Sequence, residues 1–167
     1  MTESQRAIDS LKLTRLAEVR REDIWQFIED ARLREEWWPR TTIDFTPGGS
    51  IRSTVALTAQ APTSGDENLV DAKSEQISEV VLSGQVDVVM TGHAFGFSWR
   101  RPDDPWATTV LLTLTTLSGS TQISIVELGF MGFPEEERRM RESFAAWERR
   151  LNLLENLARA SVEAPTS

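Results

Sequence analysis

The sequence predicts an α+β fold in which a curved antiparallel sheet of about six or seven strands wraps around one long C-terminal helix. A strand-like segment is followed by two short helical segments, alternating segments separated by turn residues fill the middle of the chain, and a long amphipathic segment ends it. Because a helix with one apolar stripe must bury that stripe, we expect the last helix to lie on the sheet.

The first elements change from a strand pattern to a helical one. Apolar side chains recur at roughly every second position in residues 11–19, which predicts a strand. The apolar period then lengthens to helical spacing, with a break at Asp30-Ala31 and a stop at Pro39, so we expect two short helices. Pro47-Gly48-Gly49 next supplies one fixed φ angle and two residues free to take a positive one, as a hairpin turn requires.

Further strand candidates lead from this hairpin to the last helix. Gly84 either separates two strands or marks a bulge in one long bent strand. Residues 60–75 are polar and rich in turn residues, which predicts a surface insertion. The predicted strands of this part span residues 43–45, 51–59, 77–82, 86–90, 94–100, 109–117 and 122–128. Their spacing is typical of an antiparallel meander.

Pro134 and the three glutamates that follow it predict the start of the last helix. The apolar stripe of this helix consists of Met140, Phe144, Trp147, Leu151, Leu154 and Ala158. Arginines interspersed with glutamates are typical of a solvated helix face, and we interpret the arginines of this segment in that way: Arg138, Arg139, Arg141, Arg149 and Arg150.

The composition is that of one globular domain. The chain has 167 residues, 40% of them hydrophobic, which suffices for a core, so we expect a single domain over residues 1–167 with flexible ends at 1–8 and 161–167. The net charge of -8 opposes binding to nucleic acid or to an anionic membrane.

No segment approaches the apolar length of a membrane span, and residues 1–10 do not resemble a secretion signal, so a cytoplasmic location is predicted.

The residue inventory favours few kinds of chemistry. With no Cys and one His, the chain has no thiolate nucleophile and no conventional set of metal ligands. His93 follows Thr91-Gly92 in a predicted turn, where a lone His is usually solvated. We therefore expect no metal site, no cofactor and no catalytic residue, while leaving open whether a reaction is catalysed.

Two groups of aromatic residues are candidates for a binding site. Trp37 and Trp38 are neighbours at the end of a helix, so we expect one indole in the core and the other at its rim. Phe95, Phe97 and Trp99 share one face of a strand, which we expect to point inward. These rings form either a filled core or the wall of a cavity.

Glu127 is the most informative polar residue. It follows Ile123 and Ile125 at a period of two, which puts a carboxylate on the buried face of a strand. Two interpretations stay open: Glu127 pairs with Arg15, which interrupts the alternation of the first strand, or it anchors a ligand.

These residues also resemble a known family. The resemblance is to proteins similar to the activator of heat shock protein 90 ATPase, within the START-like, polyketide cyclase-like superfamily. It rests on Arg15, Ile24-Trp25, Trp37-Trp38-Pro39, the Asp-x-x-Pro-Gly-Gly-x-x-Arg pattern of residues 44–52, Phe97-Ser98-Trp99, residues 121–130, and Trp147, Leu151 and Leu154. The resemblance implies a helix-grip fold whose interior often takes a hydrophobic ligand, and it associates the chain with the stress response.

Our first functional hypothesis is therefore the binding of a small hydrophobic or aromatic ligand between the sheet and the last helix. The expected ligand-binding residues are Trp37, Trp38, Phe95, Phe97, Trp99, Arg100, Glu127, Phe130, Met140, Phe144 and Trp147. A cyclase-like enzyme, in which Glu127 or His93 moves a proton, is the second hypothesis. The third is a chaperone partner that acts through its outer face; the oligomeric state is left open.

Overall fold

The computed structural model describes residues 10–58 and 77–163, and within them it has a seven-stranded antiparallel sheet and three helices. The predicted insertion at 60–75, the predicted flexible end at 1–8 and residues 164–167 lie outside the described residues. The predicted flexible end at 161–167 begins too early, because residues 161–163 belong to the last helix. The elements are β1 (Ser10–Ala17), α1 (Arg21–Glu29), α2 (Ala31–Arg34), β2 (Thr41–Ile43), β3 (Ser50–Thr58), β4 (Ile77–Met90), β5 (Ala94–Arg100), β6 (Thr108–Leu117), β7 (Ser120–Leu128) and α3 (Glu136–Glu163). The predicted fold class is confirmed.

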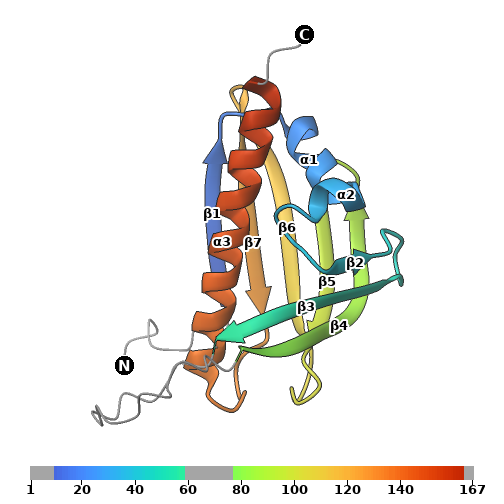
Figure 1. Ribbon diagram of the computed structural model, residues 1–167, viewed down its shortest axis with the longest axis vertical. Helices are drawn as coiled ribbons and strands as arrows, with labels where there is room; N and C mark the ends of the chain where they lie inside the picture. The colour runs from blue at the N-terminus through green and yellow to red at the C-terminus, as the bar shows by residue number, and fades with distance from the viewer. Residues whose placement is uncertain (1–9, 59–76, 164–167) are drawn as a thin grey trace, which may run out of the picture.

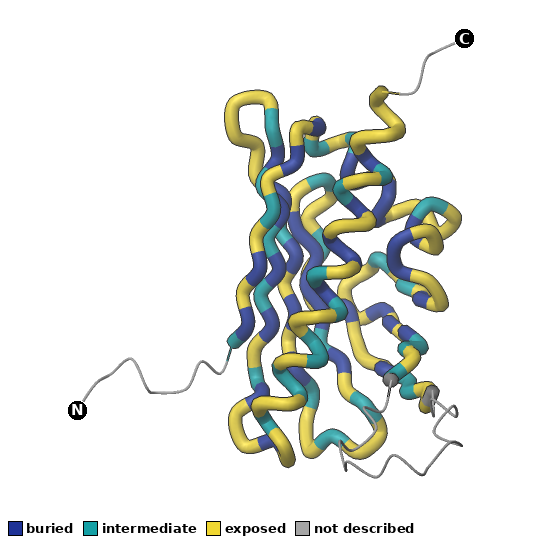
Figure 2. Tube along the Cα trace, turned by 60° about the vertical axis from the view of Figure 1, so that its left-hand side comes forward, coloured by how far each residue is buried: buried dark blue, intermediate teal, exposed yellow. Residues whose placement is uncertain are grey.

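The sheet has the strand order β1-β7-β6-β5-β4-β3-β2, and α3 lies along it (Figure 1). α3 packs against β1, and α1 packs against both α2 and α3. Buried positions alternate along the central strands, so that one face of the sheet supplies the core (Figure 2). α3 completes this core with Trp147, Leu151, Leu154 and Ala158.

β4 is one long strand of 14 residues, as one of the two sequence interpretations required. Its bulge lies between Val86 and Val88, so the predicted bulge at Gly84 is wrong. Gly84 has a different role: it lies opposite Trp99, and a Cβ there would collide with the carbonyl oxygen of Ser98. Only glycine allows β4 and β5 to approach so closely at this point.

Beyond Gly84 the end of the sheet turns out of the plane of the central strands. Residues 53–57 of β3 pair with residues 78–82 of β4 and form what we call the β3–β4 arm. In Figure 1 this arm crosses the lower end of the sheet and reaches the N-terminal half of α3.

The connection after α1 explains the paired tryptophans. Asp30 caps α2 by accepting hydrogen bonds from the N–H groups of Arg32 and Leu33, at 2.8 and 3.1 Å. Trp37 and Trp38 follow α2 in a turn, and both are buried, with 0% and 1% exposure. The expectation that one of them lies at the rim is wrong.

The first hairpin differs slightly from the prediction. β2 comprises Thr41–Ile43, so the strand predicted at 43–45 was placed too late in the chain. The reason is that the turn is wider than Pro47-Gly48-Gly49 alone: the N–H of Asp44 donates to the carbonyl of Ser50 at 2.9 Å, which closes a loop of several residues.

Candidate functional site

A buried carboxylate lies where the sheet meets α3. Glu127 of β7 is 2% exposed, which confirms its predicted place on the inner face. One carboxylate oxygen, Oε2, accepts hydrogen bonds from Trp99 Nε1 at 3.2 Å and Thr108 Oγ1 at 2.6 Å. The other, Oε1, accepts from Trp147 Nε1 at 3.1 Å and from the hydroxyl of Ser143. Four donors thus replace the water that this carboxylate loses on burial.

The structure does not bring Arg15 to Glu127. In the β1–β7 ladder Arg15 lies opposite Ile123, whereas Glu127 lies opposite Leu11. Among the described residues no ion pair joins Arg15 to Glu127. The interpretation of a pair with Arg15 is therefore wrong, and the carboxylate is instead stabilised by donors from β5, β6 and α3.

Three tryptophan rings pack together beside this carboxylate. The ring centres of Trp99 and Trp147 lie 5.8 Å apart with the planes stacked at 26°, and Trp38 meets Trp147 edge-on at 5.4 Å. Phe97 adds a fourth ring, 4.9 Å from Trp99. The interior at this level is a packed aromatic core, in which Glu127 fixes two of the indoles through their N–H groups.

Arg150 lies on this aromatic cluster. Its guanidinium carbon is 4.5 Å from the centre of the Trp147 ring, 5.6 Å from that of Trp38 and 6.0 Å from that of Trp99. The residue is only 8% exposed. Burial lowers the pKa of Arg150 to about 10, although the negative charge of Glu127 acts in the opposite direction. Arg150 therefore stays charged at neutral pH, and its assignment to a solvated helix face is wrong.

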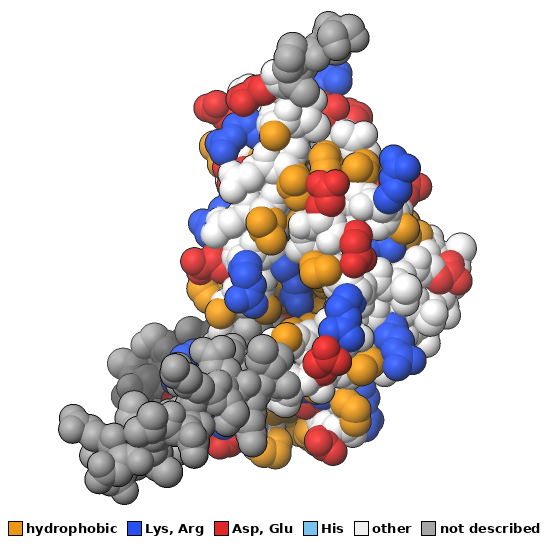
Figure 3. All heavy atoms as spheres, in the orientation of Figure 1, with side chains coloured by type: hydrophobic (Ala, Val, Ile, Leu, Met, Phe, Trp, Pro, Cys, Tyr) orange, Lys and Arg blue, Asp and Glu red, His pale blue; other side chains and the backbone are white. Residues whose placement is uncertain are grey.

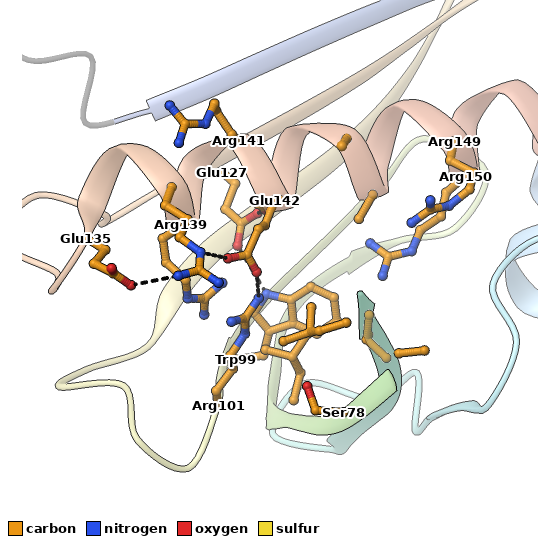
Figure 4. Close-up of a pocket in the computed structure, with 18 of the residues that line it drawn as sticks. Ser78, Trp99, Arg101, Glu127, Glu135, Arg139, Arg141, Glu142, Arg149 and Arg150 are labelled. Carbon is orange, nitrogen blue, oxygen red and sulfur yellow. Dashed lines mark hydrogen bonds and ion pairs between the residues drawn. The ribbon is translucent and has the colours of Figure 1, made fainter. Parts of the chain in front are cut away.

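A cleft of about 820 Å³ opens between α3 and the β3–β4 arm (Figure 4). Arg150 and Trp99 belong to its wall, and Glu127 lies at its inner side. Its apolar lining comes from both the arm and the helix. The lining residues are Val55, Ala56, Leu57, Ser78, Leu82, Trp99, Arg101, Glu127, Pro134, Glu135, Arg138, Arg139, Arg141, Glu142, Ser143, Ala145, Ala146, Arg149 and Arg150.

The arginines of the cleft fall into two groups. Two of those near the start of α3 are strongly paired: Arg101 with Glu142 at 3.1 Å, and Arg139 with Asp104 at 2.6 Å. Burial, reinforced by the neighbouring Arg139, lowers the pKa of Arg101. Further along the helix, Arg150 has no hydrogen bond or ion pair to any residue that the structure describes. Basic, acidic and hydrophobic side chains are interspersed over this face of the molecule (Figure 3).

The predicted site residues are thus divided between the core and the surface. Trp99 and Glu127 line the cleft, and Met140 is half-buried. Arg100 is exposed, and Phe144 is 39% exposed on the outer side of α3, so its predicted place in the buried stripe is wrong. The other predicted residues are buried in the core: Trp37, Trp38, Phe95, Phe97, Phe130 and Trp147.

Sequence reasoning missed Ser143, Thr108 and Arg150. Ser143 and Arg150 lie four residues before and three residues after Trp147, which is the spacing of one helix face. This spacing was a usable signal, because it connects both polar residues to a tryptophan of the predicted stripe. Thr108 gave no such signal, since its position beside Glu127 depends on the pairing of β6 with β7.

The two groups that the second hypothesis names as alternative proton carriers lie in different parts of the sheet. His93 is exposed, and its carbonyl accepts a hydrogen bond from the N–H of Leu114. Glu127 lies opposite Val110, four residues away from Leu114 along β6. Within residues 10–58 and 77–163, no three acidic or His side chains are placed to hold a metal ion, and no helix is long and apolar enough to cross a membrane.

Comparison with known proteins identifies one family. The sequence pattern of the family described as "Activator of Hsp90 ATPase homolog 1-like protein" matches residues 18–159. No protein of curated function matches the chain.

Solved structures show the same fold at low sequence identity. A protein from Mesorhizobium loti is similar with a TM-score of 0.65 and 19% identity, over 89% of this chain and 95% of that one. A protein from Mycobacterium smegmatis gives 0.61 and 21%, over 91% and 92%. DynU16, a protein of the dynemicin biosynthetic locus, gives 0.66 and 17%, over 94% of this chain and 48% of its own length.

Proposed function

This chain belongs to the family of Activator of Hsp90 ATPase homolog 1-like proteins, and we propose that it binds a small organic ligand with an apolar body in the cleft between α3 and the β3–β4 arm. The observation that carries this proposal is the cleft itself. Its volume of about 820 Å³ lies within the range of ligand pockets, about 300–1,000 Å³.

The lining of the cleft fits an apolar body. Val55, Leu57 and Leu82 line it from the arm, Trp99 from β5, and Ala146 from α3. The side chain at position 146 is small, so the helix leaves room above the arm. Helix-grip proteins often bind hydrophobic ligands between sheet and helix, and the origin of DynU16 in a biosynthetic locus is compatible with a small organic ligand.

This proposal moves the site away from the place that the sequence favoured. Phe95, Phe97 and Phe130 are fully buried and pack into the core, so they support the fold beneath the cleft rather than facing a ligand. Trp99 is the residue that connects the two regions, because it packs on Phe97 and also lines the cleft. A cytoplasmic location and a chaperone partner stay predictions.

The proposal is tested with phenylnaphthylamine, an uncharged dye whose emission rises in apolar surroundings. We expect saturable binding to the wild-type protein. Ala146→Trp would fill the cleft from α3 and weaken dye binding at least about tenfold, which corresponds to the burial of roughly one aromatic side chain's surface. Ala160→Trp is the matched control, because Ala160 is exposed on the same helix and does not line the cleft.

A wild-type protein that leaves the dye emission unchanged would contradict the proposal. So would equal dye affinities for Ala146→Trp and the wild type, since the dye would then bind elsewhere. Circular dichroism of both variants checks that the helix content is retained.

A further inference from the structure

We propose that the ligand of this cleft is an organic monoanion, a carboxylic acid with an apolar body, whose carboxylate pairs with Arg150. The inference rests on the proposed function and adds the charge and the recognition residue. Arg150 is a buried cation that lines the cleft and has no hydrogen bond or ion pair to any residue of the described ranges.

A buried guanidinium normally has a carboxylate or several acceptors around it, because an unpaired charge is costly to remove from water. The rings of Trp38, Trp99 and Trp147 attract the cation through their faces, but they accept none of its N–H groups. Burial lowers the pKa of Arg150 only to about 10, so the charge persists at neutral pH. The N–H donors of this side chain are therefore available to an acceptor that enters the cleft.

Glu127 is the candidate for an internal partner, because its charge acts on Arg150, but its oxygens already accept other hydrogen bonds. Its two oxygens accept from two hydroxyls and two indoles, and no ion pair joins it to Arg150. The carboxylate acts on Arg150 in another way: it fixes the indoles of Trp99 and Trp147, whose faces hold the guanidinium. Glu127 is thus a positioning residue for Arg150.

The pairing of the Arg150 guanidinium with a ligand carboxylate favours a ligand that carries a single negative charge. A guanidinium presents parallel N–H donors that match the two oxygens of one carboxylate. A second negative charge on the ligand would be opposed by Glu127, which is buried at the edges of two of these rings and already contributes to the field at Arg150. The apolar lining of the β3–β4 arm then accommodates the rest of the molecule.

The cleft also offers an approach for an anion despite the net charge of -8. Six arginines and three glutamates are among the described residues that line it. Figure 4 shows Arg149 and Arg150 extending from α3 on the side of the cleft. Arg149 is exposed and adjacent in sequence, so it adds positive potential at the entrance without pairing with a described residue.

The test uses two competitors that differ in charge but hardly in shape, naphthoate and naphthamide, each displacing phenylnaphthylamine from the wild-type protein at neutral pH. We expect naphthoate to bind at least about tenfold more tightly than naphthamide, as one charge-assisted bidentate contact provides. Equal affinities of the two competitors would overturn the inference, while the binding of the dye itself would leave the proposed function standing. Absence of dye binding would overturn both.

Three variants test whether Arg150 causes the preference for naphthoate over naphthamide. Arg150→Met should reduce the ratio of the two affinities to less than about twofold, mainly by weakening naphthoate. Arg159→Met, on the same helix but outside the cleft, removes the same charge and should keep the full ratio. Arg150→Lys keeps a charge without the planar fork and should give an intermediate ratio. An unchanged ratio in Arg150→Met, or in Arg150→Lys if the Met variant does not fold, would overturn the role of Arg150.

Discussion

The guanidinium carbon of Arg150 lies 4.5 Å from the centre of the Trp147 ring. The same indole donates its N–H to Glu127, so one side chain contacts a buried cation with its face and a buried anion with its edge. This arrangement uses the charge distribution of an aromatic ring, which is negative over the face and positive at the edge. Two opposite charges are thereby held close to each other without forming an ion pair.

Glu127→Gln should destabilise the fold. Each carboxylate oxygen accepts from one indole, so an amide nitrogen in place of either oxygen would leave an indole N–H without an acceptor. We expect the free energy of unfolding to fall by about 2–4 kcal/mol in urea titrations. Glu137→Gln, at an exposed position of α3, should change it by less than about 0.5 kcal/mol. Equal stabilities of the two variants would show that the indoles do not depend on the carboxylate.

Arg150→Met should leave the stability unchanged or raise it. The folded state lowers the pKa of Arg150 to about 10, and each pKa unit corresponds to about 1.4 kcal/mol, so the buried charge costs about 3 kcal/mol. Loss of the contacts with the rings offsets about 0.5–2 kcal/mol of the gain. The unbranched Met side chain retains the packing of the arginine stem. A loss of more than about 2 kcal/mol in urea titrations would mean that Arg150 is structural.

The pH dependence of this penalty follows from the direction of the pKa shift. Because the folded-state pKa of Arg150 is the lower one, the unfolded chain binds the proton more tightly. The penalty is therefore complete at every pH below about 10 and disappears as the pH rises towards the ordinary arginine pKa. Any gain in stability of Arg150→Met should accordingly be the same from pH 6 to pH 9, roughly three units in which neither state titrates. A gain that changes within that window would point to another titrating group.

Gly84→Ala should be far more damaging than Gly96→Ala, although both glycines lie in the sheet. A Cβ at Gly84 meets the backbone of Ser98 and Trp99, which cannot move without breaking the β4–β5 ladder. A Cβ at Gly96 would lie 3.3 Å from the end of the flexible Leu111 side chain. We expect Gly84→Ala to lose at least about 3 kcal/mol and Gly96→Ala less than about 1 kcal/mol. Similar losses in thermal and urea unfolding would contradict the close approach at Gly84.

Trp37→Phe and Trp38→Phe form a matched pair. Trp37 Nε1 donates to the carbonyl of Phe27 at 2.7 Å, whereas Trp38 Nε1 is buried and has no hydrogen-bond partner among the described residues. The loss of ring volume is the same in both variants, so the lost hydrogen bond should make Trp37→Phe the less stable by about 1–2 kcal/mol. The opposite order in urea titrations would mean that the Trp38 indole makes a bond that this structure does not show.

The sequence predicts the elements well and the site only in part. β5 and the inward face of Phe95, Phe97 and Trp99 follow from alternation, which depends only on local backbone geometry. The buried position of Glu127 follows in the same way. Its partners do not, because two of the four donors come from β5 and β6 and two from α3, and their convergence depends on strand register and on how the helix sits.

The apolar periodicity predicted the wrong rotation of α3 about its own axis at two positions. The apolar spacing assigned Phe144 to the core and Arg150 to the solvent, and the structure reverses both. A helix face that meets a buried carboxylate favours a hydroxyl at Ser143 and a cation at Arg150 over apolar side chains. Hydrophobic periodicity does not identify a buried helix face that carries polar residues, since it takes only apolar residues into account.

A crystal structure of the protein with naphthoate tests the central claim most directly. The account predicts the carboxylate within hydrogen-bond distance of the Arg150 guanidinium, and the naphthalene ring between α3 and the β3–β4 arm, against Trp99 and Leu82. Naphthoate bound away from this cleft, or in the cleft with its carboxylate directed away from Arg150, would contradict it.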